Sequence, residues 1–71
     1  MLEGKVFNKI GIWFFQVSKV LEISSSYALA VCENERKEVS YFIFEKRNKD
    51  YDPIISSLSL SSILREWKFY K

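Results

Sequence analysis

The sequence predicts a small α+β domain, rich in β-structure, with a helix at its C-terminal end. Three observations lead to this fold class. Residues 1–71 have the length of one domain near the lower limit for independent folding. Hydrophobic residues make up 48% of the chain and aromatic residues 17%, which provides the material for a dense core. Strand-like apolar runs come first, and a segment with helical spacing follows near the end of the chain.

The clearest predicted element is a β-hairpin. Residues 27–32 form a short apolar run, and residues 39–44 are rich in β-branched and aromatic side chains, as strands prefer. The segment between these runs is polar and includes Asn34, which readily adopts turn geometry. Alternation along the second run places apolar side chains on both of its faces. We therefore expect this strand to be central or covered on both sides.

Residues 10–23 fit either a strand or a helix. In a strand, Trp13, Phe15 and Val17 share one face. In a helix, the apolar spacing that begins at Ile10 follows the i, i+3, i+4, i+7 pattern. We favour the strand, because β-branched and aromatic residues lose rotamer freedom in helices. The helical alternative would give the element order α-β-β-α.

The last third of the chain predicts a terminal helix. Asp52 and Pro53 are typical of a helix N-cap and of the first helical position. A single helix from there to the end would scatter its apolar residues around the axis, so we expect a break at residues 59–61. A short turn or strand then precedes a helix that starts at Ser61 or Ser62. The side chains expected to face inward from this helix are Ile63, Leu64, Trp67 and Tyr70.

In order, these elements form a three-stranded antiparallel sheet followed by a helix. A long first strand, a hairpin and a terminal helical turn give an order that resembles small curved-sheet barrels of the SH3-like type. The resemblance concerns element order and implies a curved sheet.

The composition argues against catalysis and against a metal or cofactor site. The chain has no His, two Gly and one Cys, so it lacks the usual catalytic base, the usual zinc ligands and a glycine-rich phosphate loop. Cys32 lies within an apolar run, where a free Cys packs as a small hydrophobe. We therefore expect a protein that is not an enzyme and holds no metal or cofactor.

Secretion and membrane insertion are also disfavoured. A lone Cys cannot form an intrachain disulfide. The longest uncharged stretch, residues 53–64, is too short to span a bilayer. The first five residues carry charges where a signal peptide needs an apolar core. We expect a soluble chain in the reducing cytoplasm, without a membrane partner.

The run Trp13-Phe14-Phe15 suggests an interface. It places large apolar groups on both faces of a strand, and a chain of this size has little material to cover two faces. Exposed apolar patches and aromatic anchors are typical of interfaces. We therefore expect a homo-oligomer or another protein partner, with Arg65, Lys68 and Phe69 as a polar rim. The predicted function is a non-enzymatic protein-interaction module of the inhibitor, adaptor or regulatory-subunit type, and an inhibitor encoded by a phage or other mobile element fits this size.

The alternative function is a small nucleic-acid-binding β-barrel. The net charge of +2 is too small to imply such a partner by itself. Cations near aromatic side chains can, however, bind phosphates while the rings stack on bases. This alternative requires the cations to converge on one face of the fold. Its residues would be Lys46, Arg47, Lys49, Tyr51 and Lys71, together with Arg65, Lys68 and Phe69.

Overall fold

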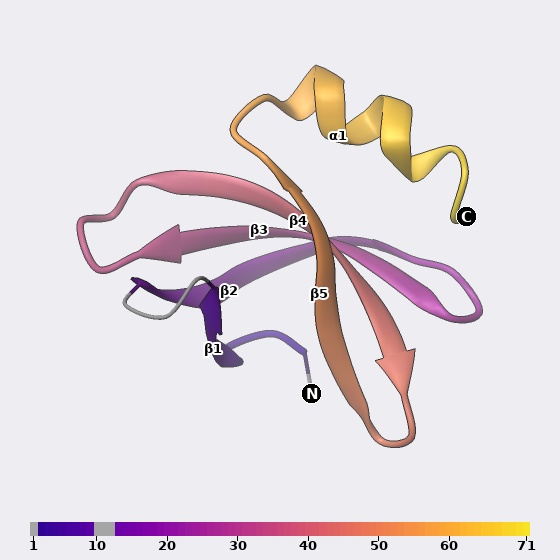
Figure 1. Ribbon diagram of the computed structural model, residues 1–71, viewed down its shortest axis with the longest axis horizontal. Helices are drawn as coiled ribbons and strands as arrows, with labels where there is room; N and C mark the ends of the chain where they lie inside the picture. The colour runs from indigo at the N-terminus through magenta and orange to yellow at the C-terminus, as the bar shows by residue number, and fades with distance from the viewer. Residues whose placement is uncertain (1, 10–12) are drawn as a thin grey trace.

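The computed structural model describes residues 2–9 and 13–71, which form a curled antiparallel sheet and one C-terminal helix (Figure 1). The strands follow one another in the sheet in chain order. The elements are β1 (Val6–Lys9), β2 (Trp13–Ile23), β3 (Tyr27–Asn34), β4 (Val39–Arg47), β5 (Asp50–Ser57) and α1 (Leu60–Trp67).

The predicted hairpin corresponds to β3 and β4, with Ala30 opposite Phe42 at its centre. Its turn is held by Asn34, whose side-chain oxygen accepts hydrogen bonds from the backbone N–H groups of Arg36 and Glu38. The central position of β4 is confirmed, because β3 and β5 flank it on either side.

Trp13–Ile23 forms the strand β2, so the helical alternative is wrong for these residues, while residues 10–12 lie outside the described part of the chain. β2 pairs with β1 and β3, and the alternation along it buries Val17 and half-buries Trp13 and Phe15 on one face. The three-strand prediction missed β1, which is only four residues long. It left the segment of β5 open between a turn and a strand, because β5 begins with residues typical of a helix start.

Asp52 and Pro53 do not start a helix; both lie in β5, where Pro53 pairs with Phe44. Pro has no backbone N–H and is tolerated in an edge strand, whose outer side does not contribute to the ladder. β5 is the last strand in the order of the described sheet, which explains how it accommodates this residue.

The sheet curls, and its inner face holds an aromatic core. Register shifts within β2, and between β4 and β5, mark bulges of the kind that bend and twist strands. The ring of Phe7 meets those of Phe42 and Phe44 edge-on, with centroids 5.0 and 5.3 Å apart. The curl also brings Lys5 to Asp50, and their ion pair of 2.8 Å joins the start of β1 to the start of β5.

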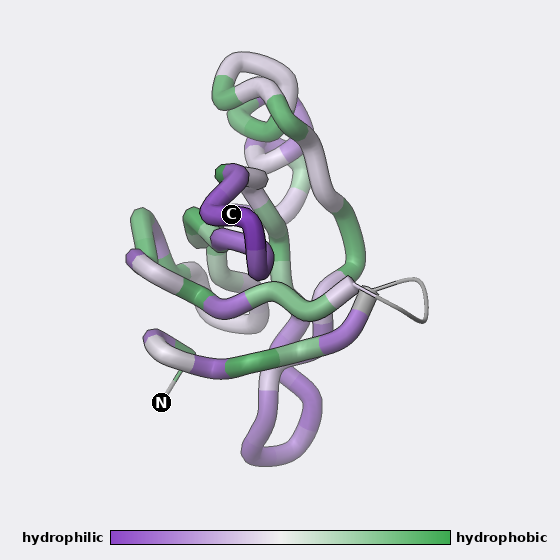
Figure 2. Tube along the Cα trace, turned by 90° about the vertical axis from the view of Figure 1, so that its left-hand side faces the viewer, coloured by the Kyte–Doolittle hydropathy of each residue, from purple (hydrophilic) through white to green (hydrophobic). Residues whose placement is uncertain are grey.

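The helix α1 covers part of the outer face of the sheet. Its buried residues Ile63 and Trp67 pack with Leu29 of β3 and Ile43 of β4. The indole N–H of Trp67 donates a hydrogen bond to the carboxylate of Glu22, which ties the helix to β2. Figure 2 shows the opposite, hydrophilic extremity of the molecule, where the β4–β5 turn projects away from α1.

The helix begins close to the predicted position but differs in its inward residues. Ser59 is the N-cap and accepts a hydrogen bond from the backbone N–H of Ser62. Leu64, predicted to face inward, is exposed. With Ile63 and Trp67 centred on the sheet, Leu64 is turned by about 100° from Ile63 and falls on the flank of the helix.

Candidate functional site

One end of the curled sheet opens into a cleft with a volume of about 390 Å³. Trp13 and Phe15 lie on the inner face of β2, because alternate residues of a strand share a face. Phe42 of β4 forms the floor, and the cross-strand pair of Phe42 and Ser56 brings β5 to the same place. The lining residues are Trp13, Phe15, Ser40, Phe42, Ser56, Ser57 and Leu58.

The cleft is aromatic and uncharged, with hydroxyl groups at its margin. The rings of Phe15 and Phe42 meet with centroids 5.2 Å apart. Among the described residues that line the cleft, none carries an ionisable side chain. The guanidinium of Arg36 lies over the ring of Trp13, 5.2 Å from its centre. This arrangement suits an uncharged apolar group that can also accept or donate a hydrogen bond.

Leu58 marks the rim of the cleft. Its side chain is 81% exposed and follows directly after β5. The backbone N–H of Ser59 donates a hydrogen bond to the Ser57 hydroxyl, so the segment around Leu58 is held locally. An exposed Leu beside an aromatic floor adds apolar surface that a bound group can cover.

The three consecutive aromatic residues predicted as one interface lie on two sides of the sheet. Trp13 and Phe15 line the cleft together, whereas Phe14 lies on the outer face and is 49% exposed. Ser40, Ser56, Ser57 and Leu58 were not predicted to join them. They meet the aromatic residues only through the curl of the sheet, and neighbours along the chain give no signal of such long-range contacts.

The predicted polar rim lies at the end of α1 and does not line the cleft, but Arg65 lines a neighbouring hollow with Ser56 and Ser57. Arg65, Lys68 and Phe69 are all exposed there. Arg65 belongs to the last turn of the helix, and the backbone N–H of Phe69 donates to the Glu66 carbonyl just beyond it. None of these three residues lines the cleft with Trp13 and Phe15.

The residues of the nucleic-acid alternative lie in two separate regions. Lys46, Arg47 and Lys49 are exposed near the β4–β5 turn, at the bottom of Figure 1, whereas Lys71 follows α1 at the right of the same view. Tyr51 packs against the inner core.

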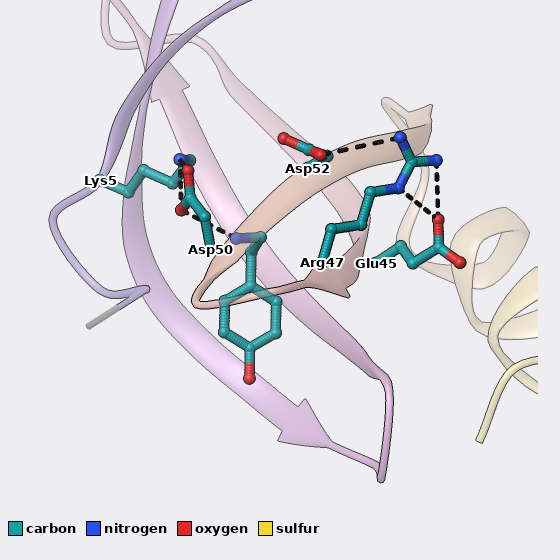
Figure 3. A network of polar contacts seen from close by, with 6 residues as sticks. Lys5, Glu45, Arg47, Asp50 and Asp52 are labelled. Atoms are coloured by element: carbon teal, nitrogen blue, oxygen red, sulfur yellow. Dashed lines mark hydrogen bonds and ion pairs between the residues drawn. The ribbon is translucent and has the colours of Figure 1, made fainter.

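Arg47 already has carboxylate partners. It pairs with Glu45 at 2.8 Å and with Asp52 at 3.8 Å (Figure 3). The hydrogen bond and the charge of Glu45 raise the pKa of Arg47. Two neighbouring carboxylates partly cancel the field that this cation could offer to a phosphate.

Cys32 lies in the inner core, as the sequence predicted, and its side chain is fully buried. Burial raises the pKa of its thiol to about 12, which keeps the thiol protonated and unreactive. Within residues 2–9 and 13–71, no three His, Cys, Asp or Glu side chains group as metal ligands would. The helix in this part of the chain is too short to cross a membrane.

Comparisons with protein-family models, curated proteins and solved structures give no significant match to this chain.

Proposed function

We propose that this chain is a non-enzymatic protein-interaction module, of the inhibitor, adaptor or regulatory-subunit type, and that it captures an apolar side chain of another protein in the aromatic cleft. The observation that carries this proposal is the combination of half-buried Trp13 and Phe15 above a fully buried Phe42 in an uncharged concavity. Aromatic anchors in such concavities dominate the energetics of many protein interfaces.

The dimensions of the cleft suit one anchor rather than a large interface. A volume of about 390 Å³ lies at the low end of the range for ligand sites. It accommodates one or two side chains of an extended segment. Because one anchor contributes only part of the energy that association costs, we expect dissociation constants on the order of micromolar for short peptides.

The chemistry at the margin defines the partner further. Ser40 and Ser57 place hydroxyl groups beside the aromatic floor, and the Ser57 hydroxyl, which accepts from the backbone N–H of Ser59, can still donate to the backbone of a bound segment. Arg36, stacked on Trp13, favours a carboxylate next to the anchor. The expected ligand is an extended segment with a large apolar residue and an acidic neighbour.

A displayed library of random peptides, panned against the full chain, tests this proposal. We expect enrichment of peptides with an aromatic or aliphatic anchor, and these peptides should perturb the fluorescence of Trp13. The variant Trp13→Ala should weaken their binding by about tenfold or more, whereas Lys49→Ala, in the distant β4–β5 turn, should leave it unchanged. Failure to enrich peptides, or equal binding to Trp13→Ala, would exclude the cleft as the binding site.

A further inference from the structure

The outer face of the sheet is only partly covered by α1, and its uncovered part exposes apolar side chains. Gln16 pairs with Glu33 and Glu33 with Val39, so these residues share a face with Ile43 beneath the helix. Phe14 lies on the same face, two residues from Gln16, and is 49% exposed. The helix lies over only one part of this face (Figure 1). We call the surface formed by α1 the raised part, and the uncovered surface around Phe14 the lower part.

The lower part contains a shallow hollow of about 240 Å³ beside the β3–β4 turn. Val6 and Phe14 supply its apolar side chains, and Glu33 and Glu35 lie at its margin with Lys37. Two carboxylates and one ammonium leave this margin with one net negative charge. The residues that line the hollow are Val6, Phe14, Phe15, Gln16, Ser18, Glu33, Asn34, Glu35 and Lys37.

The raised part ends in a projecting aromatic side chain with basic neighbours. Phe69 is 82% exposed, the highest value among the large hydrophobic residues described, and its backbone is fixed by the hydrogen bond to Glu66. Arg65 and Lys68 are exposed beside it. In Figure 1, the end of α1 and the β3–β4 turn lie at opposite ends of the longest dimension of the molecule.

We propose that two copies of this chain form a symmetric dimer through the outer face, in which Phe69 of each copy occupies the hollow beside Phe14 of the other. The basic pair Arg65 and Lys68 then faces the acidic margin formed by Glu33 and Glu35. A twofold axis that runs between the raised and lower parts makes this contact occur twice in the dimer. Both copies of each surface are then occupied, so no further copy can add. The dimer uses the outer face of the sheet, whereas the cleft opens on the inner face, so it goes beyond the proposed function; Phe15 of β2 lines both concavities.

We expect each copy to be folded before it dimerises. The accessible surface of one copy is 4869 Å². A monomeric protein of this mass has about 4,600 Å², so a single copy already has an ordinary compact surface. Variants that break the dimer should therefore remain folded and measurable.

Sedimentation equilibrium of the full chain tests the proposal. The chain should sediment as a monomer–dimer equilibrium, and Phe69→Ala should raise the dimer dissociation constant about 100-fold, because the contact is lost twice. Leu58→Ala is the matched control: Leu58 is 81% exposed and lies at the cleft instead. A chain that stays monomeric at millimolar concentration, an open-ended polymer, or equal effects of the two variants would each overturn the proposal.

Charge exchange tests the orientation of the two copies. Lys68→Glu and Glu35→Lys should each weaken the dimer by about tenfold, since each variant places like charges together twice. The double variant restores both pairs and should recover the original dissociation constant. Lys49→Glu controls for the change in net charge and should have no effect. A double variant weaker than either single variant would rule out this arrangement.

Discussion

Trp67 carries the attachment of α1 to the sheet, and truncating it should destabilise the whole domain. The side chain is 1% exposed and is the largest of the fully buried side chains. Burying an aromatic side chain removes about 150–250 Å² from water, which corresponds to roughly 4–6 kcal/mol. A domain of 71 residues has a total stability of about 4–10 kcal/mol. Trp67→Ala should therefore lower the free energy of unfolding by about 4 kcal/mol, a loss of about two fifths or more of that total stability.

A second variant separates packing from the hydrogen bond. Trp67→Phe keeps most of the apolar contact but removes the N–H that donates to Glu22. Glu22 is exposed, so water can replace the donor, and we expect a loss of only about 1–2 kcal/mol.

Urea unfolding at one fixed protein concentration, followed by far-ultraviolet circular dichroism, measures both losses. Leu64→Ala is the control on the same helix, because Leu64 is 42% exposed and should cost less than about 1 kcal/mol. If Trp67→Ala were as stable as Leu64→Ala, the helix would not be packed on the sheet as described.

Three further outcomes follow from the core, the ion pairs and the charge distribution. Cys32 should resist thiol reagents in the native state and react only in denaturant, because burial raises its pKa to about 12; fast native labelling would contradict its burial. The hydrogen bonds from Lys5 and from the backbone of Tyr51 lower the pKa of Asp50. They therefore stabilise the fold at pH values above the ordinary pKa of Asp, and this stabilisation is lost as the pH falls through the lowered pKa of Asp50. Asp50→Asn should therefore lower the melting temperature at neutral pH, with a difference from the wild type that shrinks in acid; a difference independent of pH would contradict this. Short single- and double-stranded oligonucleotides at low salt should not change the fluorescence of Trp13, whereas saturable binding that weakens steeply with salt would support the nucleic-acid alternative.

Local signals in the sequence were sufficient for the middle of the fold. The hairpin of β3 and β4 was predictable because two apolar runs flank a polar turn that contains Asn34. The strand β2 was correctly favoured over a helix by its β-branched and aromatic content. The final helix was predicted from the spacing of Ile63 and Trp67, with its start within two residues of the observed one.

At the edges of the sheet, β1 was missed and β5 was left open between a turn and a strand, for physical reasons. β1 is too short to show a period, and its place depends on pairing with β2. Asp52 and Pro53 give the same local signal at a helix start and in an edge strand, and only the presence of β4 beside them decides between the two. No local rule contains that information.

The candidate sites were likewise predictable from the sequence only where local patterns determine them. Alternation along a strand predicts that Phe14 faces away from Trp13 and Phe15, and the structure places them so. The cleft itself depends on the curl that brings Ser56 and Leu58 to Trp13, and the hollow depends on the β3–β4 turn beside Phe14. Both concavities are products of long-range pairing.

The two faces of β2 provide the most direct test of two separate binding surfaces, because Trp13 and Phe14 are sequence neighbours with different proposed roles. Peptide affinity and the dimer dissociation constant should be measured side by side for Trp13→Ala and Phe14→Ala. We expect Trp13→Ala to lose peptide binding and keep the dimer, and Phe14→Ala to keep peptide binding and lose the dimer. If each variant impaired both properties equally while remaining folded, the proposal of two separate surfaces would be wrong.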